Sequence, residues 1–241
     1  MAASASGRFF QTAKDRVFRA VFNPAGFVKG NRMYARTSGE QIHAVQFQTA
    51  TGGGSYFVNV GFHWAFLPGF LVMTQGRSVP YTRYDLLDLL MYNRLEALMP
   101  AGYPRQWNYG EDVATTELDL KTNAQNAIAA IEAFGQKWRD PSRFLDAFPP
   151  EMHARDEEES NRQIDIRDED LAKLPPLPVD TVLGQPGWYV PRYCLAYALA
   201  GIAIRLNRRS LAEAYAAFFE SHYNENVVAP IRQRIQELTR T

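Results

Sequence analysis

The chain has 241 residues, and its 26 basic and 26 acidic side chains leave no formal net charge at pH 7. This balance excludes an overall field that would attract nucleic acid or an anionic membrane. A hydrophobic content of 46% is enough for a substantial core, and the single cysteine, Cys194, excludes an internal disulfide. With a polar N-terminus and no long apolar run, the chain is expected to be cytoplasmic and not to enter a membrane.

The first predicted elements are a helix and three antiparallel strands. The helix is predicted over Arg8–Phe22, where apolar residues recur at three- and four-residue steps. The strands are predicted at Asn31–Arg36, Gln41–Gln48 and Ser55–Trp64, and glycine-bearing turns separate them. The helix is expected to pack on the apolar face of this sheet.

The turns predict a register in which Gln48 lies opposite Ser55 and Tyr34 lies opposite His43. Because side chains alternate between faces, this register gives one apolar face and one mixed face. The apolar face contains Tyr34, His43, Val45, Phe47, Tyr56, Val58 and Val60. The mixed face contains Met33, Ala35, Ile42, Ala44, Gln46, Phe57, Asn59 and Gly61. Helices or a partner would cover the mixed face, and we favour helices. We interpret His43 as a buried histidine that bonds to Tyr34.

Less regular patterns follow the strands. We favour a helix for the first half of Tyr84–Met99 and a short strand for Arg105–Tyr109. A helix is predicted for Leu120–Trp138, and a short helical turn follows it at Pro141–Phe148. The predicted fold class is therefore α+β, with an antiparallel sheet of three to five strands packed against an N-terminal helix and a mid-chain helix.

The predicted organisation has three parts. An α+β domain occupies residues 1–148, and an acidic, proline-rich linker occupies 149–187. A C-terminal helical segment at 188–241 either packs on the first domain or forms a small helical appendage.

Familiar catalytic and metal-binding motifs are missing from the sequence. The four histidines are widely spaced, so we expect no metal site. The run Gly52-Gly53-Gly54-Ser55 lacks the lysine and the following helix of a phosphate-binding loop. Arg32 and Arg36 are too few for a phosphate track, so no nucleic-acid partner is expected. No cofactor is expected either.

Several short motifs in and near the strand region resemble those of a known protein family. They are Gly26-Phe27 after the first helix, Arg32 and Tyr34 in the first strand, Phe47-Gln48 at the end of the second and Asn59 in the third. Over roughly residues 8–148 the chain resembles the bacterial domain of unknown function 4304 family. The segment from Arg94 to Pro100 and Trp107 extend the resemblance loosely, since Gln106-Trp107 replaces a Trp-Trp pair. The resemblance implies an α+β domain with no assigned activity, and by association a partner-binding or immunity role.

We therefore expect a protein- or ligand-binding module, with an immunity role as one form of it. The expected site is the mixed face and its rim, because amides offer both donors and acceptors without charge. The candidates are Gln46, Gln48, Asn59, His63, Arg94 and Trp107. The alternative is an enzyme with an unrecognised polar site near Arg94, Glu96 and His63, which a cleft of about 300 Å³ or more at these groups would favour. A structural subunit that packs its C-terminal helices on another chain also stays open, as do the partner and the oligomeric state.

Overall fold

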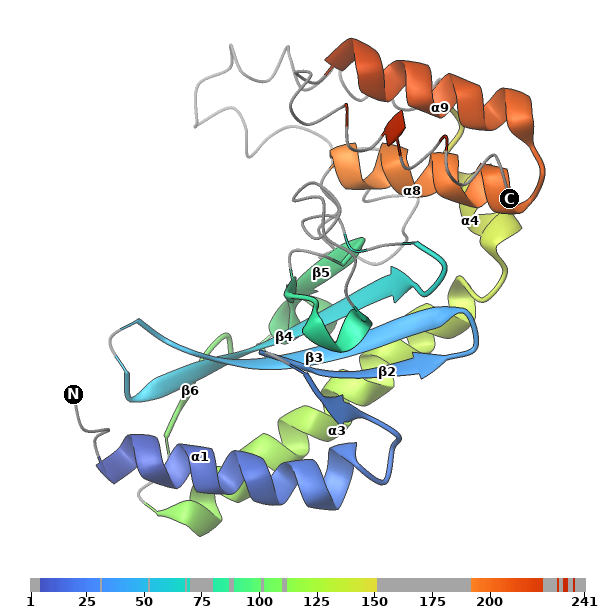
Figure 1. Cartoon of the computed structure of the whole chain (residues 1–241). Coiled ribbons are helices and arrows are strands. Elements are labelled where there is room, and N and C mark those ends of the chain that lie inside the picture. The colour runs from blue at the N-terminus through green and yellow to red at the C-terminus, as the bar shows by residue number, and fades with distance from the viewer. Residues whose placement is uncertain are drawn as a thin grey trace. The chain divides into compact units, whose positions relative to one another are not determined.

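The computed structural model describes the chain at residues 5–30, 32–51, 53–67, 69, 80–86, 89–100, 102–109, 112–150, 192–222, 229, 232, 233 and 236. These residues fall into two compact units, one ending at Arg139 and the other beginning at Asp140 (Figure 1). The predicted linker at 149–187 lies almost entirely outside the described residues. The predicted organisation into a domain, a linker and C-terminal helices therefore stays a prediction.

The first unit opens with helix α1 (Ala5–Val17), which continues directly into a π-helical segment, η1 (Phe18–Phe22). This confirms the predicted N-terminal helix. The helix ends before Pro24, which cannot continue a helical hydrogen-bond ladder. Gly26 then adopts a φ of +80°, a left-handed conformation that glycine accepts without a steric penalty, and the chain turns toward the sheet.

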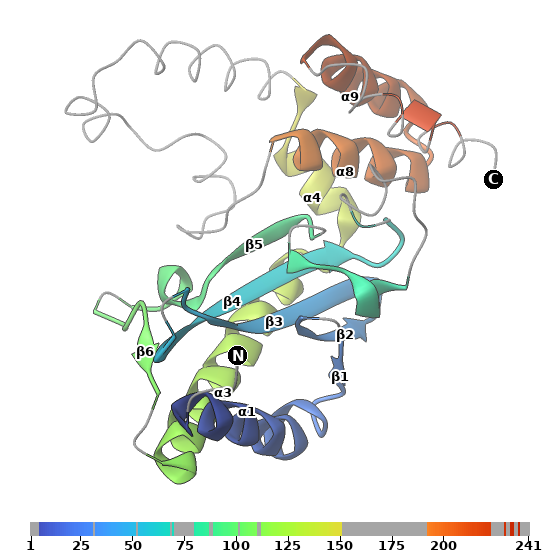
Figure 2. The same cartoon turned by 60° about the vertical axis from the view of Figure 1, so that its left-hand side comes forward.

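One antiparallel sheet is formed by six strands within the described part of the chain (Figure 2). Its order is β1-β2-β3-β4-β5, and β6 also pairs with β4. The strands are β1 (Val28–Lys29), β2 (Tyr34–Ser38), β3 (Gln41–Thr49), β4 (Ser55–Trp64), β5 (Met91–Arg94) and β6 (Trp107–Asn108). The predicted α+β class, the three-stranded ribbon and the short strand at Trp107 are confirmed.

The register differs from the predicted one by two residues. Tyr34 pairs with Val45 rather than with His43, and the second hairpin is shifted by the same amount. At the first hairpin the cause is a tight turn in which Gly39 has a φ of +60°, so that β2 extends as far as Ser38. Because the shift is an even number of residues, every side chain stays on its predicted face.

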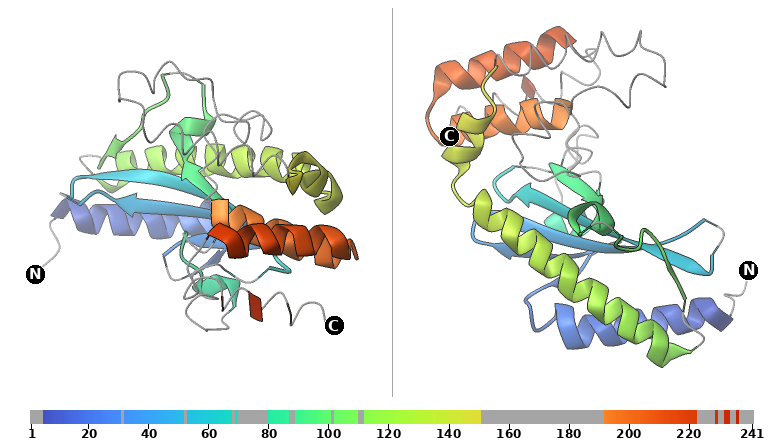
Figure 3. Two further views of the ribbon diagram at one scale, coloured as in Figure 1. Left: turned by 90° about the horizontal axis from the view of Figure 1, so that it is seen from above. Right: turned by 180° about the vertical axis from the view of Figure 1, so that it is seen from behind.

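Helices α1 and α3 (Val113–Lys137) pack on the predicted apolar face of the sheet (Figure 3). Phe22, just beyond α1, stacks on Tyr34 with ring centroids 4.6 Å apart. Phe134 of α3 meets Phe62 edge-on at 5.2 Å. These aromatic contacts bury large apolar areas, so this face is the core of the first unit. The predicted mid-chain helix is confirmed.

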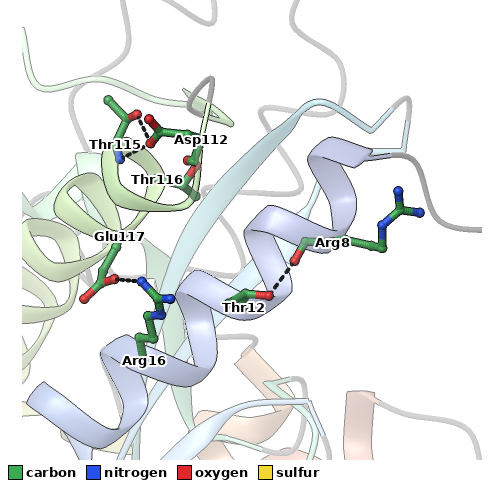
Figure 4. A network of polar contacts seen from close by, with 7 residues as sticks. All are labelled: Arg8, Thr12, Arg16, Asp112, Thr115, Thr116 and Glu117. Carbon is green, nitrogen blue, oxygen red and sulfur yellow. Dashed lines mark hydrogen bonds and ion pairs between the residues drawn. The ribbon is translucent and has the colours of Figure 1, made fainter.

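One ion pair at the surface joins α1 to the start of α3 (Figure 4). Arg16 Nη1 lies 3.3 Å from Glu117 Oε2. Asp112 caps α3, since its Oδ1 accepts hydrogen bonds from the backbone N–H of Thr115 at 2.8 Å and from its hydroxyl at 2.6 Å. These bonds from Thr115 favour the charged carboxylate and lower the pKa of Asp112.

Within the first unit, the described residues that pack on the mixed face belong to the segment between β4 and β5, which includes the short 3₁₀ helix η2 (Tyr81–Arg83). The expectation that helices cover this face therefore stays a prediction. A helix in the first half of Tyr84–Met99 is wrong: the described residues there form no α-helix, and β5 and a short 3₁₀ turn, η4 (Leu95–Leu98), follow them. The side chains packed together here are Met33, Ala35, Ile42 and Ala44 of the sheet with Tyr84, Leu86 and Leu89 of the covering segment.

Three helices of the second unit are described with their bounds. They are α4 (Pro141–Ala147), α8 (Arg192–Arg205) and α9 (Arg209–His222). Helices α8 and α9 lie side by side, and the hydroxyl of Tyr215 donates a hydrogen bond to the Phe148 carbonyl (Figure 1). Most of the helix expected near the C-terminus lies outside the described residues. None of the helices described is both long and apolar enough to cross a membrane.

Gly61 provides a test of the contact between the mixed face and its covering segment. A Cβ at this position would lie 2.2 Å from Leu89 Cδ1 and 3.2 Å from Leu86 Cδ1. We expect Gly61→Ala to lower the free energy of unfolding by roughly 1–3 kcal/mol, because overpacking a closed core costs about that much. Urea denaturation measures it, with the exposed strand position Thr37→Ala as the control.

Combining Gly61→Ala with Leu89→Ala should cost less than the sum of the two single changes, since the shortened side chain removes the clash. Additive effects would contradict the close packing of Leu89 on β4.

Candidate functional site

Three amide side chains meet on the mixed face where β3 pairs with β4. Asn59 lies opposite Gln46 in the register, and its Nδ2 donates to Oε1 of Gln46 and to Oε1 of Gln48, each at 2.9 Å. Asn59 is buried, whereas Gln48 is exposed. Both donors of the Asn59 amide are thus used, and each glutamine is held by its oxygen. Since an amide has its NH₂ group opposite its oxygen, the glutamine donors are left for other acceptors.

Arg94 of β5 extends this row of amides. It lies opposite Asn59 in the register, and its guanidinium carbon is 3.7 Å from the ring centroid of Phe57. This cation–π contact fixes the plane of the guanidinium. Arg94 Nη1 and Glu96 Oε2 are both buried and have no hydrogen-bond partner among the described residues. Buried polar atoms of this kind are rare in folded proteins, so the row contains hydrogen-bonding capacity that the described chain does not use.

His63 lies on the same face but has a different environment. Its Nε2 is 3.0 Å from the carbonyl of Leu67, and its Nδ1 accepts a hydrogen bond from the backbone N–H of Leu90 at 3.0 Å. This pattern requires a neutral ring with the proton on Nε2. Both nitrogens are therefore engaged by the backbone, and the ring anchors the segment that covers the mixed face.

Trp107 lies on the opposite face of the sheet. It pairs with Tyr56, and the two rings stack with centroids 5.7 Å apart, while Tyr103 meets Trp107 edge-on at 5.7 Å. The structure thus brings together four of the six candidates predicted from the sequence, and it separates His63 and Trp107 from them. We call the group formed by Gln46, Gln48, Asn59 and Arg94 the amide row.

Sequence reasoning missed a second polar cluster, on the helix-covered face. Arg36 Nη2 is 2.6 Å from Glu132 Oε1 and 3.5 Å from His43 Nδ1, and Arg36 Nη1 donates to the Ala25 carbonyl at 2.8 Å. The expected bond between His43 and Tyr34 is wrong, because the Tyr34 hydroxyl is buried without a partner among the described residues. The signal in the sequence was a pair of polar residues, at 41 and 43, on a face otherwise apolar.

Gln41 joins His43 to the end of α3. Its Nε2 donates to the carbonyls of Gly135 and Trp138, each at 2.9 Å, and its Oε1 lies 3.2 Å from His43 Nε2. A guanidinium can only donate, so Nδ1 of His43 faces Arg36 as an acceptor and Nε2–H donates to Gln41. Burial, followed by the nearby charge of Arg36, lowers the pKa of His43 to about 4, against the opposing effect of Glu132.

A pocket of about 570 Å³ lies beside this cluster. Its principal lining residues are Arg36, Glu40, Gln41, His43, Glu132 and Arg139. None of the candidates predicted from the sequence lines it. Within the part of the chain that the structure describes, no three His, Cys, Asp or Glu side chains come together as a metal site.

Comparison with known families identifies the first unit. The model of a domain of unknown function, DUF4304, matches residues 18–138, just over half of the chain. The chain belongs to the DUF4304 family. The DUF4304 region begins at η1 and extends just past the end of α3, so it contains the amide row and every lining residue of the pocket except Arg139. No curated protein and no solved structure matches the chain.

His43 makes the stability of the DUF4304 region depend on pH. Its folded pKa of about 4 lies below the ordinary value of 6.5, so the unfolded chain binds this proton more tightly. We expect the free energy of unfolding to fall as the pH decreases from 6.5 to about 4. The free energy of unfolding falls by up to about 1.4 kcal/mol per pH unit and by roughly 3 kcal/mol in all. Below a pH of about 4, His43 is protonated in both states and contributes no further loss.

Urea denaturation of the wild type and of His43→Gln across this range measures the effect. The variant keeps a hydrogen-bonding side chain but cannot take up the proton, so its stability should decline less steeply. Equal slopes for the two proteins would contradict the assignment of His43 as a buried neutral histidine.

Proposed function

We propose that this DUF4304 protein is a binding module for a protein partner. In this proposal the amide row receives a partner segment rich in hydrogen-bond acceptors, such as backbone carbonyls or carboxylates. The observation that carries it is the pair of bonds from Asn59 to Gln46 and Gln48, which leaves the glutamine NH₂ groups for an acceptor outside the row.

Preorganisation supports this reading. Ordering flexible side chains on binding costs affinity, and the amide row is already ordered by Asn59 and by the stacking of Arg94 on Phe57. Arginine is also among the residue types that contribute most to protein interfaces.

We favour binding over catalysis at this face. The enzymatic alternative placed a polar site near Arg94, Glu96 and His63, and of these three groups His63 has both ring nitrogens engaged by backbone groups. An immunity protein, which acts by binding a toxin, is one form of the proposed module. A bacterial cytoplasmic location belongs to the same proposal and is supported by the single cysteine.

The proposal is tested by affinity capture from a native lysate, followed by measurement of binding to the purified partner. We expect Asn59→Ala and Arg94→Gln each to weaken binding by about tenfold or more, because each removes an ordered donor or its support. Thr37→Ala, an exposed change elsewhere on the sheet, should leave the affinity unchanged.

Circular dichroism melting of each variant separates lost binding from lost folding. A partner whose affinity is the same for the wild type, Asn59→Ala and Arg94→Gln would overturn the assignment of the amide row. A wild-type chain that captures no partner would count against the module as a whole.

A further inference from the structure

We propose that the pocket beside Arg36 and His43 binds a small zwitterion of the class of the free α-amino acids. This site is separate from the amide row, which lies on the opposite face of the sheet. The pocket volume of about 570 Å³ is within the range of small-molecule sites, about 300–1,000 Å³.

The charges around the pocket are balanced. Arg36 and Arg139 contribute two cations to its lining, and Glu40 and Glu132 contribute two carboxylates. A ligand with one charge of each sign matches this lining, because its carboxylate can approach an arginine while its ammonium approaches a glutamate. A polyanion such as a nucleotide phosphate chain would be repelled by the two carboxylates of Glu40 and Glu132.

The ion pair between Arg36 and Glu132 can receive such a ligand. The side chain of Arg36 is only 15% exposed, whereas that of Glu132 is 51% exposed, so the carboxylate is the accessible member of the pair. Arg139 also lines the pocket and is exposed, so an entering carboxylate can pair with an arginine there while Arg36 keeps its bonds. An entering ammonium would share Glu132, and the two new pairs leave the net charge of the site unchanged.

The end of α3 adds a further preference for an ammonium group. The last carbonyls of a helix give its C-terminus a partial negative charge, and Gly135 and Gln136 of this last turn line the pocket. Glu132 lies one turn earlier on the same helix. The ammonium end of the ligand is therefore assigned to α3 and the carboxylate end to Arg36 and Arg139.

The remaining lining excludes other ligand classes. Among the described residues that line the pocket, Ala133 is the only apolar side chain, and the only aromatic ring is the buried imidazole of His43. Nucleobases depend on stacking, and acyl chains depend on apolar walls, so neither class fits. The ligand is accordingly compact and hydrophilic.

The floor of the pocket is rigid. A Cβ on Gly135 would lie 2.6 Å from Gln41 Oε1 and 2.7 Å from His43 Nε2, so the helix backbone is in direct contact with these polar groups. Gln41 and His43 are themselves buried and hydrogen-bonded to each other. A preformed floor of this kind lowers the ordering cost of binding.

The test is calorimetric titration and thermal denaturation of the full chain with each free L-amino acid at millimolar concentration. N-acetyl and methyl-ester forms of every amino acid that binds are tested beside it. We expect at least one free amino acid to raise the melting temperature, and both blocked forms to lose the effect, because each has lost one charge. No response to any free amino acid, or an equal response to a blocked form, would overturn the proposal.

Variants then locate the site. Glu132→Gln should weaken binding at least tenfold, while Glu117→Gln, a matched change in an ion pair at the far end of α3, should leave it unchanged. Ala133→Leu is at an exposed helical position and should block the pocket without disturbing the fold. Binding that survives both Glu132→Gln and Ala133→Leu would place the amino acid elsewhere and overturn the assignment.

Discussion

The long pairing between β3 and β4 is the constraint on which the rest of the DUF4304 region depends. It is continuous from Gln41 opposite Trp64 to Thr49 opposite Tyr56, and it is in the middle of the sheet. Because side chains alternate along each strand, this one ladder assigns every residue of β3 and β4 to the helix-covered face or to the mixed face. The core, the amide row and the floor of the pocket all follow from that assignment.

Both faces of this ladder contain polar side chains, and the hydrogen-bond partners of these side chains differ between the two faces. On the helix-covered face, Gln41 and His43 are buried and bond to each other, to Arg36 and to carbonyls at the end of α3. These bonds align the helix with the strands, since buried donors and acceptors without partners would be costly. On the mixed face, Asn59 uses both of its donors on the oxygens of the two glutamines, so their NH₂ groups take no part in these bonds.

The two faces of the sheet therefore suit two different kinds of ligand. The amide row is a preorganised set of donors with Arg94 at one side, which suits the acceptors of a partner segment. The pocket on the other face has balanced charges and a rigid polar floor, which suits a small zwitterion. The amide row and all lining residues of the pocket except Arg139 lie within residues 18–138, the region that matches the family.

The sequence by itself determined the α+β class, the three-stranded ribbon, the N-terminal and mid-chain helices and the face of each strand residue. Those features depend on local periodicity and turn chemistry, which each short segment contains. The face assignment survived a register error of two residues because the side-chain period is also two. The grouping of Gln46, Gln48 and Asn59 was predictable for the same reason, whereas the pairing of β5 with β4 that places Arg94 opposite Asn59 came only from the tertiary structure.

Only the tertiary structure decided what each face meets. The packing of the segment between β4 and β5 on the mixed face depends on Gly61, whose missing side chain leaves room for Leu89. The cluster of Arg36, His43 and Glu132 joins residues about ninety positions apart. No local pattern specifies such contacts, because they arise from packing between elements that are distant in the chain. The polar pocket beside this cluster therefore could not be predicted from the sequence alone.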